Sequence, residues 1–207
     1  MSGYVLYGYA KTGSAVIEAA LVDAGIPFEF KNLNNDKGDL QGAAYRALNP
    51  RQQVPALMHP DGSVITEIPA ILNHLADAFP ESRLAPTPGS SARAQHDRWL
   101  AFLHANIYEA VLRLYYSERY TDDPAGIDGI KNAAKAYIVR HFSIFGDAIA
   151  QGPFLFGDHP TGVDYLAWVL TTWMDRDVIV SASPQVASLG RAVAARPILA
   201  DVVARNT

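Results

Sequence analysis

The sequence contains no cysteine among its 207 residues. Disulfide bonds, thiolate zinc sites and a redox-active protein thiol are therefore excluded. Lys and Arg form no run and the formal net charge is −4, so neither nucleic acid nor an anionic membrane is a predicted partner. No apolar run approaches the ~18–20 residues of a membrane span, and the first residues lack a secretory signal pattern. These absences favour a cytoplasmic enzyme or binding protein.

Several common catalytic motifs are also missing. The sequence has neither G-x-G-x-x-G nor G-x-x-x-x-G-K-[ST], so no phosphate-binding loop is predicted. It has no H-E-x-x-H, and the six histidines show no spacing typical of metal ligands. No G-x-S-x-G marks a nucleophilic serine. We therefore predict no metal site.

Strand and helix patterns alternate in the first third of the chain. β-Branched and aromatic runs predict strands, helical spacing of apolar residues predicts helices, and Gly25 is a candidate helix C-cap. The order is βαβ followed by ββα, with the first two strands parallel. The segments are strands at 3–9 and 26–34, helices at 14–25 and 42–48, a hairpin of strands 55–59 and 63–66, and a helix at 67–79.

The composition changes between residues 79 and 94, where three prolines and several serines occur. Such a stretch indicates a domain boundary. We predict an α/β domain at 1–80, a linker at 81–92 and an all-helical domain at 93–207. In the second domain, Thr161 and Asp164 have the S/T-x-x-D spacing of a helix capping box.

The turn "AKTGSA" precedes the first predicted helix. The free N–H groups and the positive dipole end of a helix start favour a bound anion there. Thr12 and Ser14 could each add a hydroxyl donor. The structural alternative is that Ser14 only caps the helix.

The segment "NPRQQVPALMHPDGSVITEIPAIL" raises a second possibility of binding. A cis peptide before Pro55 would turn the Val54 main chain outward, where it could pair with an extended peptide ligand. Glu67, just before a helix, could bind an ammonium group. The structural alternatives are an ordinary hairpin and a helix cap.

Three segments together resemble cytosolic glutathione S-transferases of the bacterial type. They are "NPRQQVPAL", "TEIPAIL" and "FLFGDHPTGVDYLAW", and the resemblance covers 4–200. It implies a thioredoxin-like domain that binds glutathione as co-substrate and a helical domain that contributes the pocket for a small hydrophobic electrophile. It also implies a cytoplasmic homodimer with a detoxification role and no metal cofactor.

The resemblance carries binding roles onto individual residues. The pattern N-P-x-x-x-V-P-A-L implies a cis Val54–Pro55 bond, with the Val54 main chain paired to the cysteine of glutathione. The acid-Ser pair that holds the γ-glutamyl end falls on Glu67 and Ile68. Ile68 lacks the hydroxyl, and a lost charged hydrogen bond is worth ~1.5–3 kcal/mol. The resemblance further implies that Gln53 lies in the glutathione site and that Asn106 approaches glutathione across a dimer interface.

The resemblance implies a hydroxyl group that stabilises the glutathione thiolate. Ungapped spacing back from Gly25 aligns the Tyr type of this group with Tyr7, whereas spacing against the bacterial Cys/Ser type aligns its pair with Gly13 and Ser14. We favour Ser14, with Tyr7, Thr12 and Tyr9 as alternates. A helix N-terminus and a hydroxyl donor can lower a thiol pKa from ~8.5 to ~7 or below.

The predicted activity is transfer of the glutathione thiol to an apolar electrophile. Tyr108, Tyr115 and Tyr116 are candidates for lining the electrophile site; the alternative is that they pack against other helices. One rival function is a glutathione-dependent isomerase, dehalogenase or lyase acting on a single metabolite. Another is a non-catalytic binding or chaperone-like relative, which the departure at Ile68 would suit.

Overall fold

The computed structural model describes residues 3–149 and 152–207, which form two compact units. The first unit extends to Arg93 and also contains Ala194–Thr207, and the second is Ala94–Val193. The second unit is therefore shorter than the predicted helical domain, 93–207, because Ala194–Thr207 group with the first unit. Helix α10 (Ala200–Asn206) packs against α1 (Ser14–Asp23), which explains this grouping.

A four-stranded sheet forms the centre of the first unit, with the order β2-β1-β3-β4. β1 pairs in parallel with β2, whereas β3 is antiparallel to both β1 and β4. This arrangement confirms the predicted βαβ unit followed by a hairpin. The strands are β1 Tyr4–Gly8, β2 Phe28–Asn32, β3 Ala56–Met58 and β4 Val64–Thr66.

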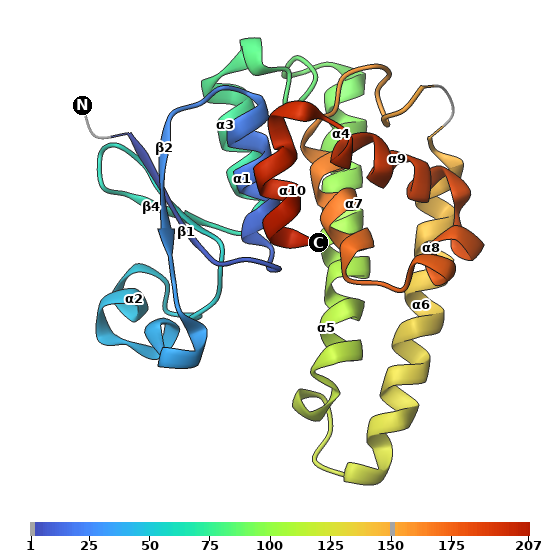
Figure 1. The fold of residues 1–207 in the computed structure, drawn as a ribbon. Coiled ribbons are helices and arrows are strands. Elements are labelled where there is room, and N and C mark those ends of the chain that lie inside the picture. Colours follow the sequence, from blue (N-terminus) through green and yellow to red (C-terminus); the bar gives the residue numbers. More distant parts are fainter. Residues whose placement is uncertain (1–2, 150–151) are drawn as a thin grey trace. The chain divides into compact units, whose positions relative to one another are not determined.

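Helices α1 and α3 (Ile68–Ala78) lie on one face of this sheet, with α10 beside α1 (Figure 1). The short helix α2 (Ala43–Leu48) lies near one end of the sheet and follows two 3₁₀ turns. Apolar side chains from the sheet, α1 and α3 fill the core between them. Its fully buried members include Leu6, Val16, Ile17, Leu21, Leu57, Ile71 and Leu75.

The C-terminus of α1 has a Schellman arrangement, in which Gly25 ends the helix as its predicted capping glycine. The Ile26 N–H donates to the Leu21 carbonyl, and the Gly25 N–H donates to the Val22 carbonyl. Gly25 has a φ of 66°, a left-handed conformation in which a side chain would be strained. The glycine thus ends the helix and turns the chain toward β2.

The second unit is helical. α4 (Ser91–Phe102) continues through a π-helical segment, Leu103–Tyr108, into α5 (Glu109–Tyr115), which packs beside α6 (Ile127–Asp147) (Figure 1). Three further helices follow, and none of the helices in residues 3–149 and 152–207 is long and apolar enough to span a bilayer. These three are α7 Gly162–Thr172, α8 Arg176–Ala182 and α9 Pro184–Ala194.

The capping box at the start of α7 is confirmed. The Thr161 N–H and hydroxyl both donate to Asp164 Oδ2, at 2.7 and 2.8 Å, and the Leu155 N–H donates to Oδ1 at 2.9 Å. Burial raises the pKa of Asp164 to about 6, although these hydrogen bonds act to lower it. The carboxylate is the shared acceptor that joins the preceding loop to α7.

We expect Asp164→Ala to lower the free energy of unfolding by about 2–4 kcal/mol at pH 7.5, because it leaves buried N–H donors unpaired and removes the cap. Urea unfolding followed by circular dichroism would measure the loss. Asp158→Ala, at an exposed position nearby, is the control. Equal stability of the two variants would contradict the assigned role of Asp164.

Candidate functional site

The strand register brings three segments of the first unit to one edge of the sheet. Tyr7 on β1 pairs with Ala56 on β3, and Ala56 pairs with Thr66 on β4. The chain beyond each of these positions therefore leaves the sheet at the same edge. The segments are the loop 9–13 after β1, the turn 51–55 before β3, and the junction of Glu67 and Ile68 after β4.

Two hydroxyl groups converge on one carbonyl at the start of α1. Thr12 Oγ1 donates to the Tyr9 carbonyl at 2.6 Å, and Ser14 Oγ donates to the same oxygen at 2.9 Å. The two hydroxyl oxygens lie 2.8 Å apart. Each hydroxyl has one proton and two acceptor lone pairs, so either hydroxyl could donate to the other. The proton of the accepting hydroxyl is then available for a ligand.

Ser14 and Thr12 differ in their accessibility. Ser14 is only 1% exposed and faces Gly8, where an added Cβ would lie 2.3 Å from the Ser14 Cβ. Thr12 is half-buried. Gly13 is the N-cap of α1, so Ser14 does not have the capping role considered as its structural alternative, and the Ser14 N–H instead donates to Thr12 Oγ1 at 3.4 Å.

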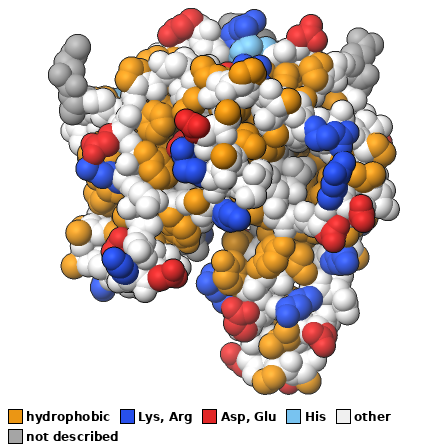
Figure 2. Space-filling model, in the orientation of Figure 1, with side chains coloured by type: hydrophobic (Ala, Val, Ile, Leu, Met, Phe, Trp, Pro, Cys, Tyr) orange, Lys and Arg blue, Asp and Glu red, His pale blue; other side chains and the backbone are white. Residues whose placement is uncertain are grey.

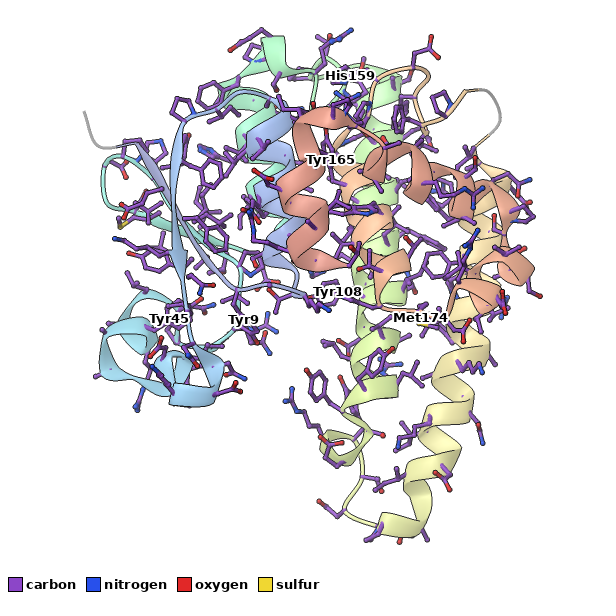
Figure 3. All side chains as sticks on the ribbon, in the orientation of Figure 1. Tyr9, Tyr45, Tyr108, His159, Tyr165 and Met174 are labelled. Atoms are coloured by element: carbon purple, nitrogen blue, oxygen red, sulfur yellow. The ribbon has the colours of Figure 1, made fainter. Side chains whose placement is uncertain are left out.

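The tyrosines after and within β1 lie in an aromatic region beside α2. Tyr7 and Tyr9 are both half-buried and pack against the cluster of Leu40, Tyr45 and Ala56. Figure 3 shows Tyr9 and Tyr45 in this region, and the ring centroids of Tyr7 and Tyr45 are 6.1 Å apart. Tyr9 thus contributes its carbonyl to the hydroxyl pair and its ring to this cluster.

The turn before β3 is held by side-chain hydrogen bonds to one carbonyl. The Gln53 carbonyl accepts from the Tyr45 hydroxyl at 2.6 Å and from Asn49 Nδ2 at 2.8 Å. Burial raises the pKa of Tyr45 to about 12, which keeps its hydroxyl proton in place. The Val54–Pro55 bond is cis, as the family resemblance implies.

Glu67 lies between β4 and α3 with a φ of 65°, a rare conformation for a residue with a side chain. Its carboxylate does not cap α3 but accepts a hydrogen bond from Arg51 Nη1 at 2.7 Å on Oε1. Both side chains of this pair are substantially exposed. Strained residues of this kind concentrate at ligand sites, so Glu67 remains a candidate for binding a cationic group.

Ile68 is the first residue of α3, and its side chain is 2% exposed. The side chain packs in the core, while the N–H belongs to the first turn of the helix, where donors have no partner within the helix.

Within residues 3–149 and 152–207, no group of three or more His, Cys, Asp or Glu could hold a metal ion.

In the second unit, Asn106 lies in the π-helical segment. Its Nδ2 donates to the Phe102 carbonyl at 3.0 Å, and its Oδ1 accepts from the Tyr137 hydroxyl at 2.7 Å. The amide therefore has partners at both ends within this unit. Because an amide group has two N–H donors and two acceptor lone pairs, one donor and one lone pair of Asn106 are not used by these two hydrogen bonds.

The predicted electrophile-lining tyrosines have different surroundings. The Tyr108 ring lies 5.2 Å from those of both Trp173 and His104, and the Tyr115 hydroxyl donates to the Trp173 carbonyl. Tyr116 is exposed and stacks with Arg119 instead. Figure 2 shows hydrophobic side chains at the surface over α5 and α6.

Sequence reasoning missed four residues of these sites. Trp173 is half-buried at the C-cap of α7, and no motif of the sequence points to it. His104 is half-buried in the π-helical segment, and the spacing of the histidines gives no indication of a site there. Tyr45 in "GAAYRAL" and Arg51 in "NPRQQ" carried no signal beyond their closeness to a recognised motif.

Comparison with known proteins identifies the family. Profiles described as "Glutathione S-transferase, N-terminal domain" and "Glutathione S-transferase, C-terminal domain" match residues 14–78 and 106–205. Glutathione S-transferase GST-4.5 of Xanthomonas campestris is 32% identical over 149 residues, which cover 72% of this chain and 71% of that protein. The chain belongs to the glutathione S-transferase family.

Other glutathione S-transferase relatives extend the comparison. A sphingomonad glutathione S-transferase, solved in complex with glutathione, superposes with a TM-score of 0.79 at 26% identity over 97% of both chains. Maleylpyruvate isomerase of a Ralstonia species is 27% identical over 167 residues, covering 77% of this chain and 76% of that enzyme. The relatives therefore include both transferases and isomerases.

We expect Tyr45→Phe to lower the free energy of unfolding by about 1 kcal/mol, because it removes one of the two donors to the Gln53 carbonyl. It should also speed amide hydrogen exchange in residues 51–56. Mass spectrometry of peptic peptides would detect the change. Tyr120→Phe, which removes an exposed hydroxyl bonded to Glu109, is the control. Unchanged exchange in 51–56 would show that Tyr45 does not hold the turn.

Proposed function

We propose that this glutathione S-transferase family member binds glutathione at the sheet edge, holds its sulfur as a thiolate, and transfers it to an apolar electrophile. The observation that carries the proposal is the convergence of three groups at that edge. They are the hydroxyl pair of Thr12 and Ser14, the main chain at Val54, and the carboxylate of Glu67. Each suits a different part of one short peptide.

Binding would use the main chain for the peptide body and charge for its γ-glutamyl end. Val54 pairs as an added strand with the cysteine residue of glutathione, next to Gln53 and Pro55. The Glu67 carboxylate accepts a hydrogen bond from the ammonium group of the γ-glutamyl residue. The N–H of Ile68 donates to the α-carboxylate of that same residue. The Arg51–Glu67 pair does not oppose this, because exposed ion pairs contribute only ~0–1 kcal/mol and can open.

Activation would use the start of α1. Ser14 is the predicted activating residue, but its burial favours Thr12 as the group that touches the sulfur. When Thr12 donates to the sulfur, Ser14 keeps its hydrogen bond to the Tyr9 carbonyl. The thiol releases its proton to solvent, and the thiolate accepts a hydrogen bond from Thr12. The sulfur then donates an electron pair to the electrophile, whose leaving group departs with its bonding electrons.

The electrophile site and the homodimer are proposed from the resemblance to the family. The aromatic cluster of Tyr108, Trp173 and His104 offers an apolar surface suited to a hydrophobic electrophile. A cytoplasmic homodimer, in which Asn106 of one subunit approaches glutathione bound to the other, stays a prediction.

We expect millimolar glutathione to raise the melting temperature of the protein. Glu67→Gln should weaken glutathione binding tenfold or more, because a charged hydrogen bond worth about 1.5–3 kcal/mol is lost. Isothermal titration calorimetry would measure both affinities, with the exposed Glu81→Gln as control. Failure of the wild-type protein to bind glutathione would overturn the proposed function.

We expect Thr12→Val to raise the pKa of bound glutathione by about one unit, since the variant keeps the shape of the side chain but loses the donor. Ser14→Ala should have a smaller effect if it acts through Thr12. Thiolate absorbance measured against pH would report the pKa, with the exposed Thr87→Val as control. An unchanged pKa in both variants would shift the activating role to Tyr7 or Tyr9.

The similarity to maleylpyruvate isomerase supports a second candidate, a glutathione-dependent isomerase. Both reactions require the thiolate, but an isomerase returns glutathione unchanged. Assays with a chloronitroaromatic electrophile and with a cis-dicarboxylic substrate would separate them by glutathione consumption. A protein that binds glutathione but turns over neither substrate would fit the dehalogenase, lyase or non-catalytic alternatives.

A further inference from the structure

Three of the polar contacts made by Ala194–Thr207 reach α1 or the loop before it. Arg196 donates to Asp23 at 2.6 Å, and Arg205 donates to Glu18. Both acidic partners lie on α1. The third contact differs, because it reaches the loop before α1 and involves its main chain. In that contact the Lys11 N–H donates to the Asn206 Oδ1 at 2.7 Å.

Asn206 is held in one orientation by two different partners. While its Oδ1 accepts from Lys11, its Nδ2 donates to the Val202 carbonyl at 2.8 Å. Exchanging the amide oxygen and nitrogen would place donor against donor and acceptor against acceptor. The side chain is 5% exposed, so water does not readily replace either bond. Asn206 is therefore a defined acceptor aimed at the loop.

Lys11 occupies an unusual place in that loop. Its φ is 62°, a left-handed conformation that residues with side chains rarely adopt. It lies between Tyr9, whose carbonyl receives both hydroxyl protons, and Thr12, whose hydroxyl is one of the donors. The main-chain direction at Lys11 therefore determines where the Thr12 hydroxyl lies relative to that carbonyl.

We propose that Asn206 is a positioning residue for thiol activation, holding loop 9–13 in the conformation that presents the Thr12 and Ser14 hydroxyls. The proposal rests on the proposed function, in which those hydroxyls stabilise the thiolate. Asn206 acts on the reaction through the Lys11 N–H and does not touch substrate. The carboxylates of Asp23 and Glu18 instead dock the C-terminal segment onto α1.

The test compares Asn206→Ala with Asn206→Asp, which keeps an acceptor oxygen for Lys11. We expect Asn206→Ala to raise the pKa of bound glutathione by about one unit and to lower kcat about tenfold, while the glutathione Kd changes less than about threefold because Val54 and Glu67 are untouched. Asn206→Asp should show a smaller rise than Asn206→Ala, because it keeps the acceptor for the Lys11 N–H although its second oxygen cannot donate to the Val202 carbonyl. Thr207→Ala, which removes only a hydroxyl bonded to the Val203 carbonyl, is the control.

Amide hydrogen exchange at Lys11 gives a second readout that needs no ligand. We expect exchange at Lys11 to accelerate more than about tenfold in Asn206→Ala and to stay slow in Thr207→Ala. An unchanged thiol pKa and kcat in a folded Asn206→Ala variant would overturn the proposal. If the wild-type protein fails to bind glutathione, the proposed function fails instead, and slow Lys11 exchange would still support the placement of the loop by Asn206.

Discussion

The register of three strands is the constraint on which the candidate site depends. Tyr7, Ala56 and Thr66 lie side by side across β1, β3 and β4, so the segments that continue from them meet at one edge. A slip of one residue would turn every side chain of the slipped strand to the opposite face of the sheet. Because β1 is buried along almost all of its length, such a slip would expose apolar side chains, and the core thereby stabilises the site.

Side chains hold the segments at this edge where the strand ladder ends. The Tyr9 carbonyl accepts hydrogen bonds from two hydroxyl groups, and the Gln53 carbonyl accepts from a phenol hydroxyl and an amide. The Lys11 N–H donates to Asn206. These bonds satisfy main-chain groups that a loop would otherwise leave to water. They also fix conformations at positive φ, which leaves main-chain groups and hydroxyls of defined direction for a peptide ligand.

Local signals in the sequence predicted much of this fold. The order of strands and helices, the hairpin around "PDG" and the glycine end of α1 each depend on residues close together in the chain. The capping box at Thr161 is local in the same way. The orientation of individual side chains was not predictable, because it depends on what packs against them. Ser14 faces Gly8 and is buried, and Ile68 turns into the core, although both positions suggested contact with a ligand.

The sequence by itself determined the family, the two-part α/β and helical plan, and the absence of a cysteine thiol in the protein itself. Only the tertiary structure decided which hydroxyl is accessible, that Arg51 pairs with Glu67, and that the chain's last helix belongs to the first unit. The physical reason is sequence separation. Lys11 and Asn206 are 195 residues apart, and no local preference of either residue encodes a hydrogen bond that forms only after α10 has packed against α1.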